Sequence, residues 1–347
     1  MLKKATCDIL DFKEYFESLL EEKKLYYCIV NPSARSGHGE SLWSQLENRF
    51  KSENIRYKVV FTVGPGHALR VTKKLTTQDF PQDQLPLKLV VMGGDGTLNE
   101  VVSGIVDFDK VVVGYVPVGS SNDFARDLGL PKTPVELFDH ILDGKVIRKL
   151  DLGKLTYNKK TKDLSRLHDD NIEDTRIFDV SAGIGFDAAV CEEALSSGTK
   201  NFLNKIGLGK LTYLTIAVRQ ILKADKIPCD IIIDDNEPIH LDHFLFVAAM
   251  IHHYEGGGFK FAPDADLTDG LFNMCIVGAL PIARIFVALP LAYVGKHYWI
   301  KGIQHVTARK VTINTHIPMW VHTDGEVQVK SDSITLECLQ QKLSLII

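Results

Sequence analysis

Short apolar runs alternate with segments of helical periodicity over roughly the first 145 residues of the chain. Four of these runs, at residues 26–30, 57–62, 87–92 and 111–118, predict strands. Between strands, apolar side chains that recur three or four positions apart predict helices. Their members are Leu42, Trp43, Leu46 and Phe50 in one helix, and Val135, Phe138, Ile141 and Leu142 in another that Gly144 ends. This alternation is typical of a parallel sheet flanked by helices.

Polar and small residues follow each of the four predicted strands, at 31–37, 62–66, 93–97 and 117–122. Open parallel sheets bind their ligands at the carboxyl ends of the strands. Because those ends lie along one edge of the sheet, the four loops together predict a single nucleotide site.

The sharpest local signal is the glycine-rich turn that follows the third strand, Gly93-Gly94-Asp95-Gly96-Thr97. Glycines let a backbone approach a pyrophosphate closely, and the amides of the next helix start would point at the same place. A carboxylate beside phosphates is repulsive unless a divalent cation or a transferable proton lies between them, so Asp95 indicates catalysis. Thr97 and Glu100 have the spacing of a capping box, which predicts that the helix begins there.

The pattern changes after Asp143-Gly144 to shorter strands with turn signals, and we expect a domain boundary near Lys149. Apolar runs at residues 229–234, 244–250, 271–277, 310–314 and 334–339 predict a largely antiparallel sheet or sandwich. The expected architecture is an α/β nucleotide-binding domain over residues 1–148, with an N-terminal helical extension. A β-sandwich-like substrate domain over 149–330 follows, and roughly the last 15 residues can return to the first domain.

Composition places the chain among ordinary globular proteins. It has 347 residues, of which 45% are hydrophobic and 24% charged, enough to bury a large core in two domains. The formal net charge of -4 gives no basic footprint and disfavours nucleic acid as a partner. Six cysteines without paired spacing, and an N-terminus that lacks a signal peptide, favour the cytoplasm.

The long apolar run at residues 271–295 does not predict a membrane span. Pro281 divides it into a strand-like piece and a helix-like piece, and Arg284 would lie at mid-depth, where insertion of an arginine costs about 2.5 to 3.5 kcal/mol.

Several other motifs admit ordinary structural interpretations. Gly183-Ile184-Gly185 loosely matches a dinucleotide fingerprint, but no acidic residue follows at the expected distance, so a close backbone approach is favoured. The Asp324-Gly325 and Asp269-Gly270 pairs suit hairpin turns. His252, His253, His305, His316 and His322 lack metal-ligand spacing and are interpreted as packing or surface residues. The P-loop motif is absent.

Taken in order, the motifs resemble the bacterial diacylglycerol kinase family, which is related to sphingosine and ceramide kinases and more distantly to NAD kinase. The resemblance rests on the segments at 31–37, Thr62, 93–100, 117–126, 183–187, 256–258, Pro263, 269–271, 295–297 and 324–326. It covers the chain from about Leu25 to the C-terminus. Each motif is weak alone, and the set is specific.

The resemblance implies a fold, an activity and a set of residues. It implies an ATP-dependent lipid kinase with an α/β nucleotide domain and a C-terminal β-sandwich. It further implies that ATP is held by Asn31, Pro32, Ser33, Arg35, Ser36, Gly37, Thr62, Gly93, Gly94, Asp95, Gly96, Thr97, Leu98, Asn99 and Ser120.

The implied proton acceptor is Glu326, and Asp95 and Asp324 would hold a network of Mg²⁺ and water on the phosphates. The roles of Asp95 and Glu326 could be exchanged. Asp269 and the main-chain oxygens of Asp266 and Leu271 match a magnesium site that is structural in the family.

The identity of the lipid that accepts the phosphate rests on a shorter segment. Residues 122–126 resemble the bacterial glycerolipid version, which implies diacylglycerol as substrate and phosphatidic acid as product. The alternatives are a sphingoid base, ceramide, undecaprenol, a phosphatidylglycerol-type lipid or a soluble substrate such as NAD. We expect peripheral contact with the inner face of the membrane, with residues 202–223 either docking on it or forming a packed helix. The resemblance leaves open whether the chain forms a homodimer.

Overall fold

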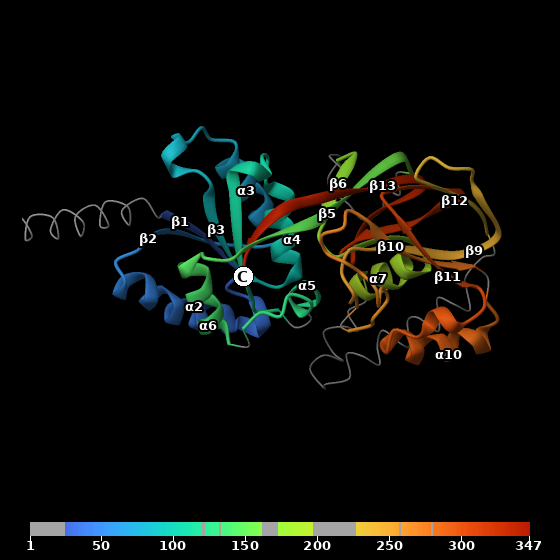
Figure 1. Cartoon of the computed structure of the whole chain (residues 1–347), viewed down its shortest axis with the longest axis horizontal. Helices are drawn as coiled ribbons and strands as arrows, with labels where there is room; N and C mark the ends of the chain where they lie inside the picture. Colours follow the sequence, from blue (N-terminus) through green and yellow to red (C-terminus); the bar gives the residue numbers. More distant parts are fainter. Residues whose placement is uncertain are drawn as a thin grey trace, which may run out of the picture. The chain divides into compact units, whose positions relative to one another are not determined.

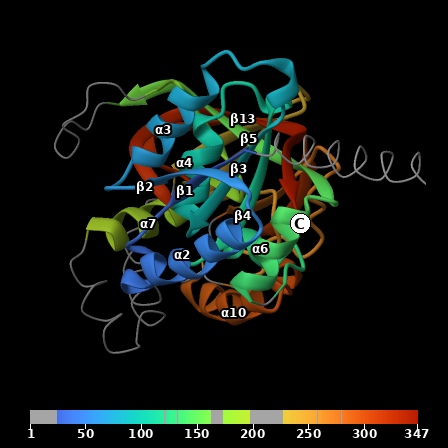
Figure 2. The same ribbon diagram turned by 90° about the vertical axis from the view of Figure 1, so that its left-hand side faces the viewer.

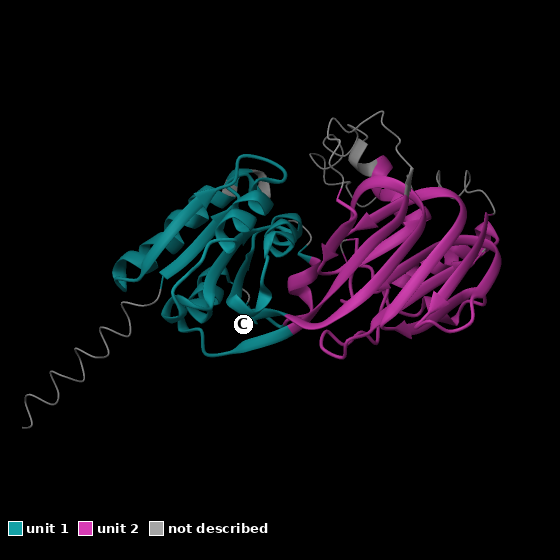
Figure 3. Cartoon of the chain, turned by 90° about the horizontal axis from the view of Figure 1, so that it is seen from above, with its two compact units in different colours: residues 1–122, 129–149, 343–347 teal, residues 123–128, 150–342 magenta. Residues whose placement is uncertain are grey.

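The computed structural model describes residues 25–119, 122–131, 133–161, 173–196, 227–256, 258–278 and 280–347. The chain divides into two compact units (Figure 3). Unit 1 takes residues 1–122, 129–149 and 343–347, and unit 2 takes residues 123–128 and 150–342. The predicted N-terminal extension, Ser120 and the segment 202–223 lie outside the described residues.

Unit 1 is built on a parallel sheet whose strands match the four apolar runs. They are β1 (Leu25–Val30), β2 (Arg56–Phe61), β3 (Leu87–Gly93) and β4 (Val111–Pro117), in the spatial order β2-β1-β3-β4. Beside β4, the last residues of β13 (Glu326–Ile346) add a parallel pairing of Leu345 with Val113. The chain leaves β1 toward β2 on one side and later returns to β3 on the other. The strand order therefore reverses between β1 and β3, which is where such sheets bind ligands.

Helices cover both faces of this sheet (Figure 2). On one face lie α2 (Ala34–Ser52) and α6 (Pro134–Asp143), and on the other lie α3 (His67–Thr76) and α4 (Asp95–Gly104). Short 3₁₀ turns η1 (Gln82–Gln84) and η2 (Phe108–Lys110) precede β3 and β4.

The predicted helical stripes account for the packing on the first face. Trp43, Leu46 and Phe50 of α2 share a core with Phe138 and Ile141 of α6, and this core includes alternate side chains of the strands. Helix α6 ends at Gly144, as predicted, and Gly144 adopts the left-handed conformation. The Thr133 hydroxyl caps the other end by accepting a hydrogen bond from Glu136 N.

Unit 2 is dominated by antiparallel strands. They are β5 (Ile147–Thr161), β6 (Thr175–Phe178), β7 (Ser181–Gly185), β8 (Ile227–Ile233), β9 (Ile239–Met250), β10 (Phe272–Gly278), β11 (Ile303–Ala308), β12 (Lys310–Thr323) and β13. The long strands β9 and β12 are labelled in Figure 1, and β7 and β8 each pair with both of them, so β7 and β8 lie one after the other between these strands. The strand order through β7 is β11-β10-β9-β7-β12-β13. The expected combination of an α/β domain and a β-rich domain is confirmed.

Helices flank the strands of unit 2. They are α5 (Asp123–Arg126), α7 (Phe186–Ser196), α10 (Ile282–Tyr293) and the 3₁₀ turn η3 (His297–Trp299). The strand β10 is buried on both faces, because Met274 and Ile276 face the main core while Cys275 and Val277 face a second core beneath α10.

The apolar run at 271–295 thus divides into β10 and α10 at Pro281, as predicted. Among the described residues, no helix has the length and apolar character required to cross a membrane.

Candidate active site

The carboxyl ends of the strands in unit 1 are joined by backbone hydrogen bonds that continue the sheet by one residue. Asn31 N donates to Met92 O, Thr62 N to Val30 O, and Val118 N to Gly93 O, each at 2.8 Å. The four predicted loops therefore begin side by side at one edge of the sheet, at the reversal between β1 and β3.

The turn after β3 leaves the start of α4 open. Gly94 is the N-cap residue, which has no side chain to cap the helix, and the helix begins at Asp95. A Cβ on Gly119 would lie 2.7 Å from Gly94 Cα, so the loops after β3 and β4 approach too closely for any larger residue. An uncapped helix N-terminus beside bare glycine backbone is suited to bind phosphate oxygens.

The predicted capping box at this helix is wrong. Because α4 begins two residues before Thr97, the Thr97 hydroxyl instead accepts a hydrogen bond from Asn31 Nδ2 at 3.1 Å. Glu100 faces α3, where its carboxylate accepts from Gly66 N at 2.6 Å and Ala68 N at 3.0 Å. These residues tie the loops after β1 and β2 to α4.

Asp95 lies in the first turn of α4, where a carboxylate is favoured by the helix dipole. Its Oδ1 is 3.4 Å from the Tyr115 hydroxyl, which is also 3.4 Å from Gly93 O. The fully buried Tyr115 therefore fixes the base of the turn.

The structure brings most of the predicted nucleotide residues to this edge. Asn31, Pro32, Ser33, Thr62 and residues 93–97 all lie on the loops just described. Leu98 and Asn99 are buried within α4, and Leu98 N donates to Gly94 O at 3.1 Å. Gly37 lies in the first turn of α2, and the side chains of Arg35 and Ser36 lie outside the described residues.

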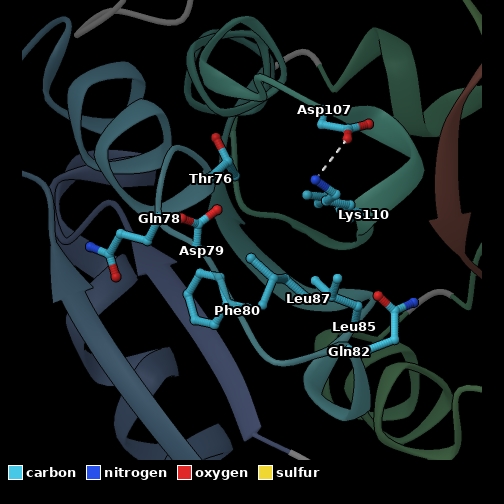
Figure 4. A pocket seen from close by; sticks show the side chains of 10 residues that line it. Thr76, Gln78, Asp79, Phe80, Gln82, Leu85, Leu87, Asp107 and Lys110 are labelled. Carbon is cyan, nitrogen blue, oxygen red and sulfur yellow. Dashed lines mark ion pairs between the residues drawn. The ribbon is translucent and has the colours of Figure 1, made fainter.

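A pocket in unit 1 lies elsewhere. Its volume is about 120 Å³, and it opens at the amino ends of β3 and β4, where Leu87 and Val111 begin those strands (Figure 4). Asp107 and Lys110 form an ion pair of 3.3 Å at its wall. It is at the opposite end of the strands from the glycine turn, and we assign it no part in the site.

In unit 2, the hairpin between β12 and β13 carries the other predicted acidic residues. Asp324 and Gly325 have φ angles of 50° and 76°, as a tight hairpin turn requires. The Asp324 carboxylate accepts three hydrogen bonds from the β6–β7 connection, from Asp179 N at 3.0 Å and from Val180 N and Ser181 N at 2.9 Å each. Asp324 thus anchors the turn, and a role on phosphates stays a prediction.

Glu326, the first residue of β13, is half-exposed and directly follows this anchored turn. Its carboxylate lies 3.2 Å from the guanidinium of Arg176, which is mostly buried and also donates to Glu326 O at 3.4 Å. The direction of the Glu326 side chain is therefore set by Arg176 of β6.

A buried acidic network behind the hairpin was missed from the sequence, where His322 was interpreted as an ordinary packing residue. His322 is fully buried, with Nε2 at 3.0 Å from Asp187 Oδ2 and Nδ1 at 3.7 Å from Glu255 Oε1. The Ser181 hydroxyl donates to the same Glu255 oxygen at 2.7 Å. Burial opposes protonation of the imidazole, but Asp187 and Glu255 outweigh it and raise the pKa of His322 to about 9.

The same network explains the Gly183 motif. A Cβ on Gly183 would overlap the contact between Asp187 and His322, so glycine is required for that pair to form. Burial raises the pKa of Glu255, and the nearby His322 and Ser181 oppose the rise. The signal in the sequence was Asp187, four positions after Gly183. Its carboxylate contacts His322, which is distant in the sequence.

The predicted magnesium loop is also in unit 2. Asp266 Oδ1 accepts from Thr268 N at 2.9 Å, and Asp269 Oδ1 accepts from Leu271 N at 2.9 Å. The loop is held by Asp151, whose carboxylate accepts from Gly270 N at 2.7 Å and Gln341 N at 2.6 Å. Burial raises the pKa of Asp151, and Asp269 and Asp266 add to the rise.

Those oxygens fit a hard cation chemically, since a cation would relieve the repulsion between the acidic groups of this loop. Within the described ranges, no three His, Cys, Asp or Glu side chains converge as metal ligands. Two of the three predicted ligands are main-chain oxygens.

Comparisons with known proteins assign this architecture. Residues 26–155 match the diacylglycerol kinase catalytic domain, and residues 180–347 match the YegS C-terminal NAD kinase beta sandwich-like domain. The chain belongs to the diacylglycerol kinase family of lipid kinases.

Relatives of this lipid kinase span nearly its whole length. The diacylglycerol kinase of Bacillus subtilis is 25% identical over 302 residues, covering 86% of this chain and 88% of that protein. The Bacillus subtilis protein YtlR is 27% identical over 306 residues, covering 87% of this chain and 93% of YtlR. YtlR is named as a lipid kinase, and its name specifies no lipid. A crystal structure from Bacillus anthracis, titled as a diacylglycerol kinase, has a TM-score of 0.63 and 19% identity, and supports the fold; it covers 93% of this chain and 96% of that one.

The segment that favoured a glycerolipid has a packing role in this lipid kinase. Phe124 is fully buried with its ring 4.8 Å from that of His252, and Asp127 accepts from His253 N at 2.7 Å. Burial opposes ionisation of Asp127, but His252 and His253 together outweigh it and the pKa of Asp127 is lowered. The contact with His252 gives Phe124, within residues 122–126, a structural reason that is independent of the lipid.

Proposed function

We propose that this protein transfers the γ-phosphate of ATP to the hydroxyl of diacylglycerol and releases phosphatidic acid and ADP. The observation that carries the proposal is the start of α4 directly after Gly94, whose backbone packs against Gly119, at the strand reversal of a diacylglycerol kinase catalytic domain. The names of the relatives support diacylglycerol as the acceptor.

Phosphoryl transfer passes through a loose transition state, so positioning and charge compensation supply most of the catalysis. The backbone amides of Gly94–Gly96 would hold phosphate oxygens, and Asn31 and Thr97 would keep the loops in register. As the lipid oxygen bonds to the γ-phosphorus, the bond from phosphorus to the ADP oxygen breaks and the hydroxyl proton leaves.

We assign that proton to Glu326. Its carboxylate is half-exposed and held in place by Arg176, and the turn before it is fixed by Asp324. Asp95 is the alternative acceptor, since it lies within the glycine turn itself. On this assignment Asp324 acts by positioning Glu326.

Magnesium would be held by Asp269 with the main-chain oxygens of Asp266 and Leu271, where it would stabilise the acidic loop. Magnesium bound with ATP would neutralise phosphate charge, and Asp95 is the unit 1 carboxylate suited to it. The protein would work in the cytoplasm at the inner face of the membrane.

The test is transfer of labelled phosphate from ATP to a panel of lipids in mixed micelles. The panel contains diacylglycerol, a sphingoid base, ceramide, undecaprenol and phosphatidylglycerol, with NAD as the soluble control. The proposal predicts labelled phosphatidic acid with the highest kcat/KM. If another lipid were labelled preferentially, that lipid would be the acceptor in place of diacylglycerol. Labelling of NAD alone would contradict the assignment as a lipid kinase.

A further inference from the structure

The outward face of α10 is apolar along its whole length. Ile282, Phe286, Pro290 and Tyr293 are spaced by four, four and three residues, which places them on one side of the helix, and all are exposed. The opposite side, with Ile285, Ala288 and Ala292, packs into the second core of unit 2. A surface helix normally turns polar residues to water, so this helix has a second apolar face to cover.

The exposed face continues beyond the helix. Trp299 on η3 is 76% exposed, and Val287 and Val294 are each more than half exposed. Six large exposed apolar side chains thus lie within 18 consecutive residues, namely Ile282, Phe286, Val287, Tyr293, Val294 and Trp299. We call these six residues the α10 face. Clusters of exposed apolar side chains of this kind mark docking sites on protein surfaces.

The charged residues near the α10 face in the sequence are all basic. Residues 270–323 contain no Asp or Glu, in a chain whose formal net charge is -4. Arg284, Lys296 and Lys301 flank the face; the Lys296 ammonium lies 5.0 Å from the Trp299 ring centroid, and Arg284 donates to Lys301 O at 3.4 Å. Aromatic residues with basic neighbours are the composition that binds at the boundary of an anionic bilayer.

We propose that the α10 face docks this protein on a bilayer containing anionic phospholipid. With only 12 residues, α10 is suited to lie in the plane of the headgroups with Phe286 and Tyr293 directed into the acyl boundary. The lysines and the arginine interact with acidic headgroups. The proposal rests on the proposed function in one respect, because it supplies access to a substrate that resides in the bilayer.

The direct test is cosedimentation of the full chain with vesicles. Vesicles of phosphatidylcholine with phosphatidylglycerol are compared with vesicles of phosphatidylcholine alone. We expect binding to the first that weakens at high salt, and a reduction of about tenfold or more for Trp299→Ala with Phe286→Ser. The matched controls are Val287→Ser, which should weaken binding, and Val106→Ser in unit 1, which should not; these valines are 55% and 58% exposed.

The charge component is tested by Lys296→Gln with Lys301→Gln, which we expect to weaken binding about 25-fold, or about fivefold per lysine. Lys51→Gln with Lys145→Gln changes the net charge equally in unit 1 and should leave binding unchanged. Equal losses for both pairs would refute a local contact and leave only a general charge effect.

Two further measurements separate the remaining outcomes. If the α10 face is covered by a second copy of the chain or by residues 197–226, its variants will change the oligomeric mass or lower Tm without altering vesicle binding, and the proposal fails. Activity on a water-soluble short-chain diacylglycerol should be unchanged in all variants. If the parent protein phosphorylates no diacylglycerol but its vesicle binding is lost in the variants of the α10 face, the proposed function is contradicted and the docking proposal stands.

Discussion

The buried His322 network makes the stability of unit 2 depend on pH. The ring of His322 lies between the carboxylates of Asp187 and Glu255, which raise its pKa from 6.5 to about 9 despite burial. Below pH 6.5 the imidazole is protonated in both the folded and the unfolded chain, and its stabilisation is complete. Above that pH the unfolded chain loses the proton first, so the stabilisation declines until the folded protein titrates near pH 9.

The magnitude follows from the difference between the two pKa values. The rise from 6.5 to about 9, at about 1.4 kcal/mol per pH unit, corresponds to about 3 kcal/mol. We predict that the unfolding free energy of unit 2 falls by about that amount between pH 6.5 and pH 9.5. Glu255 acts in the same direction at lower pH, because its pKa is raised above the usual 4.5.

The comparison protein is His322→Gln with Glu255→Gln, which removes the imidazole and one of its two carboxylate neighbours while keeping polar side chains of similar size. Urea denaturation is followed by the fluorescence of Trp299 and Trp320, both in unit 2, in a Trp43→Phe background. The free-energy difference between parent and variant should shrink by about 3 kcal/mol from pH 6.5 to pH 9.5. A difference that stays constant within about 1 kcal/mol over this range would refute the charged-histidine account.

Four other predictions concern the site. Glu326→Gln should lower kcat by about 10² to 10⁴ with ATP affinity unchanged in a direct binding assay, and near-normal turnover would transfer the base to another residue. Gly119→Ala directs a Cβ to within 2.7 Å of Gly94 Cα and should lower kcat/KM for ATP by about 10², while circular dichroism stays the same. Asp324→Asn removes the charge that holds three amides, and should cost about 2 to 4 kcal/mol of stability in urea titration. Asp269→Ala should lower Tm by about 2 to 4 °C and abolish any rise in Tm on adding magnesium, whereas an unchanged magnesium response would place the cation elsewhere.

Much of the fold could be predicted because its signals are local. The buried strands of unit 1 are continuous apolar runs, and each observed strand differs from its predicted run by only a residue or so. The end of α6 at Gly144 follows from a residue suited to the left-handed conformation. The glycine-rich turn at residues 93–96 indicated a helix directly after β3, although the capping box placed its start at Thr97 and α4 begins at Asp95.

The parts that could not be predicted depend on partners distant in sequence. Glu100 has the spacing of a cap for its own helix, yet it binds amides at the start of α3, because α4 begins at Asp95. Asp187, which contacts the His322 ring, is 135 positions away in the sequence, so no local spacing related the two residues. The apolar periodicity of α10 did not reveal which of its faces is buried.

The most direct test of the account is a crystal structure with a non-hydrolysable ATP analogue. We predict phosphate oxygens within hydrogen-bonding distance of the backbone amides of residues 94–96, at the start of α4. A triphosphate bound anywhere else on the protein would contradict the central claim.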